Sequence, residues 1–169
     1  YALNKVGCKA IISAESFKTS FYLEMLQALV PELENCEAGA LVAEKLPHLK
    51  HVIRMGSEKS AGMHNFSAVC QLGSAAEFSQ LDVIEGQLHA NDPINIQFTS
   101  GTTGNPKGAT LSHRNILNTA YFVGQNMHLS AADRLCIPVP LYHCFGMVMG
   151  TLCCVSHGAT MVLPCEAFD

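Results

Sequence analysis

The pattern of apolar and polar residues in the first part of the chain predicts two strands with one helix between them. Residues 9–13 form a short apolar run that predicts a buried strand, and residues 51–55 predict another strand. Between them, the apolar side chains of residues 21–29 recur at helical spacing, and Pro31 ends the predicted helix. Residues 31–48 contain two prolines and a glycine and are therefore expected to form a loop.

The middle of the chain is less regular. Residues 56–65 predict a polar loop, and residues 66–88 are expected to be helical in parts. The segment 91–93 breaks the chain before residues 94–98, where apolar and polar side chains alternate at period two, as in a half-buried strand. Residues 109–111 predict a second strand, so the segment between the two strands is expected to connect them directly.

A helix is predicted directly after this second strand. Ser112 is a good N-cap, because its hydroxyl can accept a hydrogen bond from an otherwise unpaired backbone N–H group. Gly124 lies inside this helix and costs about 1 kcal/mol relative to alanine, which weakens the prediction for its second half. One face of the helix carries Ile116, Ala120, Val123 and Met127.

The last part of the chain predicts a strand, a helix and another strand. Residues 134–138 form the first strand, and an apolar helix is expected over residues 143–157. Gly158 ends this helix, and residues 159–163 form the last strand. The alternation of strands and helices predicts an α/β fold with a largely parallel sheet flanked by helices.

The composition fits a globular chain of about one domain and excludes several classes of protein. Of the 169 residues, 49% are hydrophobic and 14% are charged, which excludes a disordered chain. The net charge is −4 and no two Lys or Arg residues are adjacent, so nucleic acid is a poor candidate partner. The longest apolar run, near residues 145–155, is too short to cross a membrane.

The chain contains eight cysteines but shows no secretory signal peptide. We therefore expect reduced, buried thiols in an intracellular compartment rather than disulfides. Cys153 or Cys154 with His157, followed by Cys165, is a weak candidate for a metal site. A zinc site favours paired Cys-x-x-Cys or well-separated His pairs, which are missing, so ordinary core cysteines are the preferred interpretation.

Six consecutive small residues follow the strand predicted at residues 94–98. Gly101 and Gly104 can adopt positive φ, so that backbone N–H groups converge on one point, and the neighbouring hydroxyls can bind phosphate oxygens. Lys107 adds a point positive charge suited to phosphate. We expect a polyphosphate-binding loop, with a flexible Ser/Thr/Gly linker as the alternative. The predicted loop consists of Thr99, Ser100, Gly101, Thr102, Thr103, Gly104, Asn105, Pro106 and Lys107.

This loop is neither a Walker loop nor a dinucleotide fingerprint. In a Walker loop the lysine follows the last glycine and precedes Ser or Thr, whereas here Lys107 precedes Gly108, and Ala109 follows. A G-x-G-x-x-G motif is also missing. The segment 99–108 instead resembles the phosphate loop of the adenylate-forming enzymes, which include acyl-CoA synthetases, luciferases and the adenylation modules of peptide synthetases.

A second segment carries the same resemblance. Residues 140–146 match the family pattern of proline, an apolar residue, an aromatic residue, histidine, two residues and glycine, about forty residues after the loop. The resemblance implies that His143 lies at the acyl-substrate end of the cleft, where it gates the site. By itself, a histidine at the start of an apolar helix is more often a hydrogen-bonded structural residue; the two motifs at this spacing favour the site role.

The resemblance implies the reaction and the ligands. In this family ATP and a carboxylate form an acyl-adenylate and pyrophosphate, and coenzyme A then displaces AMP. The loop would hold the β and γ phosphates, with Mg²⁺ bound through Thr102 or Thr103. Segments 1–8, 92–98 and 108–113 resemble the mitochondrial medium-chain acyl-CoA synthetases of the family. This likeness implies a fatty acid as substrate and the mitochondrial matrix as location.

The resemblance also implies that residues 1–169 are an incomplete AMP-binding domain, cut at both ends. The Tyr-Gly-x-Thr-Glu motif, the Thr-Gly-Asp motif and the C-terminal domain with its catalytic lysine are missing. We therefore expect these residues alone to be inactive, with small-molecule substrates and the remainder of the chain as partners. A non-catalytic truncated product and a family member acting on another carboxylate remain alternatives. The sequence does not predict acyl chain length or oligomeric state.

Overall fold

The structure is a computed structural model that describes residues 1–100 and 104–165. The chain divides into two compact units, Tyr1–Glu85 and Gly86–Asp169, which we describe separately. That both belong to one incomplete domain stays a prediction.

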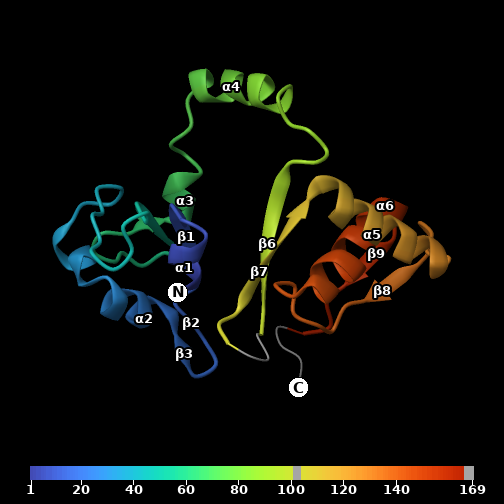
Figure 1. Cartoon of the computed structure of the whole chain (residues 1–169), viewed down its shortest axis with the longest axis horizontal. Helices are drawn as coiled ribbons and strands as arrows, with labels where there is room; N and C mark the ends of the chain where they lie inside the picture. The colour runs from blue at the N-terminus through green and yellow to red at the C-terminus, as the bar shows by residue number, and fades with distance from the viewer. Residues whose placement is uncertain (101–103, 166–169) are drawn as a thin grey trace. The chain divides into compact units, whose positions relative to one another are not determined.

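The elements of the first unit (Figure 1) are α1 (Ala2–Lys5), β1 (Ala10–Ser13), β2 (Ser16–Phe17), β3 (Ser20–Phe21), α2 (Tyr22–Leu29), the 3₁₀ helix η1 (Pro31–Asn35), β4 (His51–Arg54), β5 (His64–Asn65), α3 (Phe66–Val69) and α4 (Ala75–Glu85).

The sheet of the first unit is parallel, in the order β1-β4-β5, and β2 and β3 form a small antiparallel hairpin. Strands β1 and β4 confirm the two predicted strands, but the expectation that residues 9–13 are buried was wrong. Ile12 is 54% exposed, whereas Val52 and Ile53 of β4 are buried. The physical reason is position: β1 pairs with one neighbour at the edge of the sheet, whereas β4 lies between two strands.

The core of this unit draws heavily on the segment predicted as a loop. Beyond η1, residues 36–50 form no helix or strand, yet Leu41, Leu46 and Leu49 are buried there. Helix α2 forms as predicted and ends before Pro31, but it buries Leu23 and Leu26. Met25 and Leu29, which share the predicted periodic pattern, are about half exposed.

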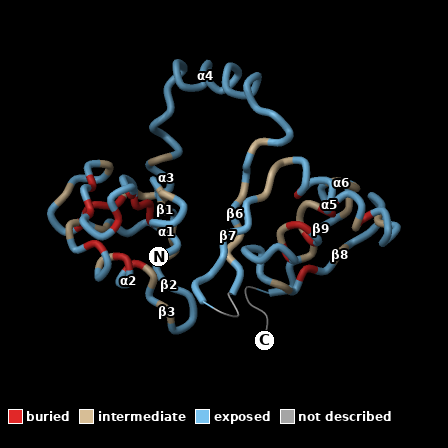
Figure 2. The backbone as a smooth tube through the Cα atoms, viewed as in Figure 1, coloured by how far each residue is buried: buried red, intermediate tan, exposed pale blue. Residues whose placement is uncertain are grey.

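Helix α4 contains no buried residue, and its backbone is coloured as exposed along its whole length in Figure 2. Four of its large apolar side chains are exposed: Phe78, Leu81, Val83 and Ile84. With α3, this helix confirms that residues 66–88 are helical in parts. Among the helices of residues 1–100 and 104–165, none combines the length and apolar character that a membrane span requires.

The second unit alternates strands and helices after an initial hairpin. Its elements are β6 (Pro93–Thr99), β7 (Lys107–Ser112), α5 (His113–Asn126), β8 (Arg134–Cys136), the π-helix η2 (Phe145–Leu152), α6 (Cys153–His157) and β9 (Thr160–Val162). Strands β8 and β9 are parallel, and β6 and β7 are antiparallel. Two parallel sheets with packed helices confirm the predicted α/β class. The chain also contains two antiparallel hairpins, so its strand pairing is mixed rather than purely parallel.

Helix α5 confirms the prediction made from residues 112–127. The Ser112 hydroxyl accepts a hydrogen bond from the Asn115 N–H group at 3.3 Å. Ile116 and Ala120 are buried against Val148 of η2, and Gly124 is buried on the same helix. Met127, predicted on the buried face, is 48% exposed because it lies just beyond the end of the helix.

The helix predicted over residues 143–157 is also present, with a different first part. Residues 145–152 form a π-helix, in which hydrogen bonds join residues five apart, and α6 continues it. The Thr151 hydroxyl reinforces this register by donating to the Gly146 carbonyl at 3.2 Å. Gly158 ends the helix in the left-handed conformation, with φ of 72°, and β9 follows as predicted.

Candidate functional site

The predicted phosphate loop lies at the tip of the hairpin formed by β6 and β7 (Figure 1). Thr99, the last residue of β6, pairs with Lys107, the first residue of β7. The strand–loop–strand prediction is therefore confirmed. Three of the predicted loop residues, Gly101, Thr102 and Thr103, lie outside the described residues. The roles of the loop residues in binding phosphate stay a prediction.

The described residues of the loop are accessible to a ligand. Residues 99, 100 and 104–107 are all exposed. Thr99 and Lys107 are cross-strand partners, so their side chains leave the same face of the hairpin. The Thr99 hydroxyl donates to the Lys107 carbonyl at 3.4 Å and so closes the base of the loop. Among the described residues, no atom lies within 4 Å of the position that a Cβ at Gly104 would take.

The burial pattern of β6 is the reverse of the one expected for a half-buried strand. Ile94 and Ile96 are 52% and 43% exposed, whereas Asn95 and Gln97 are half-buried. Asn95 pairs with Leu111, and Leu111 packs against the cluster of Ile116, Ala120 and Val148. The polar face of β6 therefore turns toward the core of its own unit, and the Asn95 Oδ1 atom is buried there without a hydrogen-bond partner among the described residues.

The N-terminus of α5 is not available to bind the phosphate. The N–H groups of His113 and Arg114 donate to the carbonyls of Asp92 and Ala90, at 3.3 and 2.7 Å. The Asn115 N–H group donates to Ser112, as described above. A Walker loop instead leads directly into a helix whose free N–H groups hold the phosphate. Here the loop leads into a strand, which agrees with the sequence-based exclusion of the Walker motif.

His143 lies in the turn that precedes η2, and its imidazole orientation is defined locally. The Phe145 N–H group donates to Nδ1 of His143 at 3.1 Å, and the Cys144 sulfur lies 3.9 Å from the same nitrogen. A backbone N–H can only donate, so Nδ1 is unprotonated and the proton of the neutral ring is on Nε2. The side chain is exposed. His143 therefore offers an N–H donor to a ligand oxygen.

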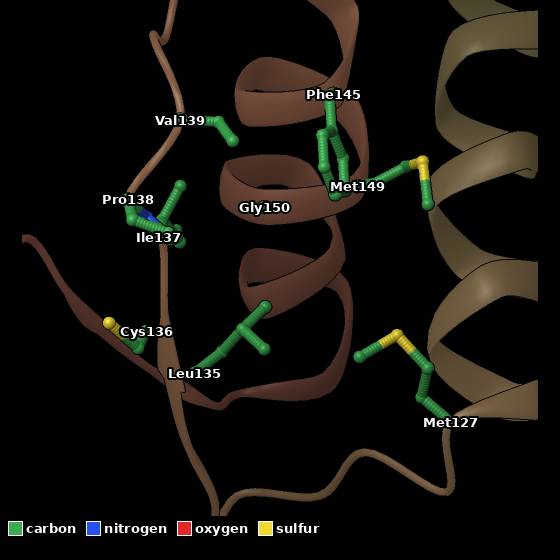
Figure 3. A pocket seen from close by; sticks show the side chains of 9 residues that line it. All are labelled: Met127, Leu135, Cys136, Ile137, Pro138, Val139, Phe145, Met149 and Gly150. Atoms are coloured by element: carbon green, nitrogen blue, oxygen red, sulfur yellow. The ribbon is translucent and has the colours of Figure 1, made fainter. Parts of the chain in front are cut away.

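An apolar cavity of about 220 Å³ begins at Phe145, two residues after His143. Figure 3 shows Phe145, Met149 and Gly150 on one helix, η2, which lies between the segment 135–139 and α5; the Met149 side chain points toward α5, and Met127 lies at the end of α5. Sequence reasoning did not find this cavity. A usable signal was the pair Gly146 and Gly150, four residues apart, because small residues at that spacing let neighbouring segments approach a helix closely. The lining residues are Met127, Leu135, Cys136, Ile137, Pro138, Val139, Phe145, Met149 and Gly150.

The cysteines are less uniformly buried than expected. Cys153 and Cys154 are buried, and burial raises the pKa of both thiols, so they are protonated near neutral pH. Cys70, Cys136, Cys144 and Cys165 are exposed, which corrects the expectation that most thiols are buried. These four lie on loops or at element ends rather than inside the packed helix pair.

The weak metal candidate at α6 has a structural explanation. The His157 ring stacks on Tyr121 with ring centres 5.3 Å apart, and its Nδ1 lies 3.1 Å from the Cys153 carbonyl oxygen. The described part of the chain contains no group of three or more His, Cys, Asp or Glu side chains placed to hold a metal ion.

The family can now be assigned from the whole chain. The sequence pattern of the AMP-binding enzymes matches residues 1–169. The chain belongs to this family. The predicted resemblance to adenylate-forming enzymes is thereby confirmed, over the complete length of the chain rather than at the two motifs alone.

Similar AMP-binding enzymes include two mitochondrial ligases and two proteins of solved structure. The mitochondrial medium-chain acyl-CoA ligases ACSF2 of Rattus norvegicus and Danio rerio are 45% and 42% identical to the chain over its full length. The chain spans 28% of the length of each. The crystal structure of the anthranilate CoA ligase AuaEII with anthranoyl-AMP has a TM-score of 0.72 at 22% identity, over 98% of this chain and 28% of that one. Mycobacterium smegmatis MbtA has a TM-score of 0.60 at 19% identity, over 90% and 24%. These two likenesses confirm the predicted fold.

Proposed function

We propose that this chain is part of an ATP-dependent acyl-CoA ligase that activates a medium-chain fatty acid as an acyl-adenylate and transfers the acyl group to coenzyme A. Residues 1–169 would form an incomplete AMP-binding domain of that ligase. The names of the ACSF2 relatives support the medium-chain substrate and a mitochondrial location. The family supports ATP and coenzyme A as substrates.

The observation that carries the proposal is the hairpin tip. Exposed Lys107 and Thr99 leave the same face at the base of a loop whose remaining described residues are accessible. The loop is backed by strands, so its own backbone N–H groups and the Lys107 ammonium must supply the positive field that a polyphosphate needs. Gly104 carries no side chain, and no atom of the described residues lies within 4 Å of where a Cβ would be, so a phosphate could approach the backbone closely there.

Charge stabilisation at this loop suits the first step of the reaction. A carboxylate oxygen attacks the α-phosphorus of ATP, the bond from that phosphorus to the bridging oxygen breaks, and pyrophosphate leaves with the negative charge. In-line displacement at phosphorus needs positioning and charge stabilisation rather than covalent help from the protein. Lys107 supplies a cation next to the leaving group. In the second step the coenzyme A thiolate attacks the acyl carbonyl carbon and AMP leaves.

His143 and the apolar cavity support the acyl end of the site. The Nε2–H group of His143 can donate to a carboxylate oxygen, and the cavity begins two residues further on at Phe145. The cavity of about 220 Å³ is lined almost entirely by apolar side chains, which suits the methylene groups of a fatty acid.

Mg²⁺ enters the proposal through the loop threonines. The described residues supply no acidic cluster that could hold it, and the threonines proposed to bind it, Thr102 and Thr103, lie outside the described residues. When bound, the ion would add positive charge against the phosphates. Thr99 is a poorer candidate ligand, because its hydroxyl already contacts the Lys107 carbonyl.

The proposal is tested by Lys107→Ala in the full ligase, with acid-dependent exchange of pyrophosphate into ATP as the measurement. Removing one positioned charge-stabilising group typically lowers the rate by roughly 10²–10³-fold. Lys107→Arg should recover part of the activity, because it keeps the charge. Lys59→Ala, at an exposed lysine in a loop of the first unit, serves as the matched control and should leave the exchange unchanged. Exchange in Lys107→Ala at the wild-type rate would show that this loop does not stabilise the leaving group.

A further inference from the structure

Gly146 occupies a space that no other residue could occupy without moving the backbone. A Cβ at this position would lie 2.9 Å from the carbonyl carbon of Pro140, closer still to its oxygen, and 3.1 Å from the Cα atom of Leu141. All three neighbours are backbone atoms, so no side-chain rotation can relieve the contact. Alanine is favoured over glycine in helices by about 1 kcal/mol, yet here the close approach excludes it.

The same carbonyl anchors His143. The His143 N–H group donates to the Pro140 oxygen at 3.2 Å, and the Met147 N–H group donates to the His143 carbonyl at 3.0 Å. The Phe145 N–H group holds the imidazole through Nδ1. Three hydrogen bonds thus connect His143 to the first turn of η2 and to Pro140. Gly146 lies at the point where this turn touches Pro140.

We infer that Gly146 is a positioning residue for His143: its missing side chain lets the first turn of η2 lie against the Pro140 carbonyl and thereby sets where the imidazole N–H group points. This inference rests on the proposed function for its effect on activity. A methyl group at residue 146 must push the Pro140 carbonyl away from the helix. That displacement breaks or lengthens the hydrogen bond from the His143 N–H group to the Pro140 carbonyl oxygen, and it tilts the imidazole ring.

Two other helical glycines show why this position is distinctive. A Cβ at Gly150 would meet the side chain of Ile137, with the nearest atom 2.9 Å away, and a side chain can rotate. A Cβ at Gly124 would meet the side chains of His157 and Cys153, on α6. Neither contact involves the backbone that holds His143. Gly124→Ala is therefore a control that crowds the same unit without touching the turn at residues 140–147.

The test is Gly146→Ala in the full ligase, assayed with separate titrations of carboxylate and ATP. A misplacement of about 1 Å in a positioned group can cost about 10²-fold. We expect kcat/KM for the carboxylate to fall by about that factor while the KM for ATP stays within about twofold. Gly124→Ala should change neither kcat/KM for the carboxylate nor the KM for ATP. Equal losses for both substrates, or none, would overturn the positioning role.

Two spectroscopic measurements do not depend on activity. The ¹⁵N shifts of the His143 ring in the wild-type protein should show an unprotonated Nδ1 and a protonated Nε2, and Gly146→Ala should shift the ring toward a mixture of tautomers. Unchanged shifts would refute the inference. If the variant does not fold, the wild-type protein still provides a test. The His143 amide should be protected from hydrogen exchange, and exchange as fast as in an unstructured peptide would show that Pro140 does not hold it.

These outcomes separate the inference from the proposed function. If the wild-type protein catalyses no acid-dependent pyrophosphate exchange, the proposed function fails, and the ring shifts of His143 still decide whether Gly146 positions it. If the wild-type protein is active and Gly146→Ala behaves as wild type in both titrations, the inference fails and the proposed function stands.

Discussion

Gly124→Ala provides a test in which helix propensity and tertiary packing predict opposite signs. Propensity alone predicts that alanine inside α5 stabilises the helix by about 1 kcal/mol. In the folded unit, however, the new methyl carbon would lie 2.5 Å from Nδ1 of His157 and 2.9 Å from the sulfur of Cys153. The His157 ring cannot simply rotate away, because it stacks on Tyr121 and its Nδ1 contacts the Cys153 carbonyl.

The expected loss of stability follows from the two contacts that the His157 ring would lose. Losing the stacking on Tyr121 costs about 0.5–1.5 kcal/mol, and losing the hydrogen bond to Cys153 costs about 1 kcal/mol. The sum of about 2 kcal/mol exceeds the gain of about 1 kcal/mol from helix propensity. We therefore expect a net destabilisation of about 1 kcal/mol, localised at the contact between α5 and α6.

Hydrogen exchange of the amides in α5 and α6, measured in the full ligase, reports this local free energy. A loss of about 1 kcal/mol corresponds to roughly fivefold faster exchange, whereas a dominant helix propensity would slow exchange by a similar factor. His157→Ala removes the ring that would crowd a methyl group at residue 124. Adding Gly124→Ala to that variant should therefore lower the local free energy of opening by less than it does in the wild-type protein. Slower exchange in Gly124→Ala with His157 intact would refute the packing argument.

Two further predictions concern the site itself. Gly104→Val should fold normally, because no atom of the described residues lies within 4 Å of the position that a Cβ would take, but should lower pyrophosphate exchange by roughly 10²-fold or more, because the branched side chain blocks close approach of phosphate to the backbone. Thermal melting and the exchange assay separate the two effects, and wild-type exchange in this variant would remove Gly104 from the loop's function. His143→Ala should raise the KM for the carboxylate by about tenfold, as expected for the loss of one hydrogen bond to a charged group, while the KM for ATP changes little. A selective loss of ATP affinity would place His143 at the wrong end of the site.

The local elements of this protein follow from its sequence because their causes are local. Ser112 caps α5, Pro31 prevents α2 from continuing, and Gly158 ends α6 in a left-handed conformation that glycine adopts without strain. The hairpin around the predicted phosphate loop followed from the sequence for the same reason, since two short strands flank a run of small residues. The resemblance of residues 99–108 and 140–146 to two motifs of the family, at the expected spacing, was sufficient to predict the family.

Only the tertiary structure decided which faces are buried and which glycines are essential. The alternation in β6 predicted a half-buried strand but not that its polar face would turn inward, because that depends on Leu111 of the partner strand packing against α5 and η2. Periodicity in α2 could not separate Leu26 from Met25, since burial depends on what packs against each side of the helix. Gly124 and Gly146 look like weak points in their helices when only neighbours along the chain are considered. Folding brings His157 close to Gly124 and the Pro140 carbonyl close to Gly146. Helix propensity depends only on neighbours along the chain, so it could not predict either contact.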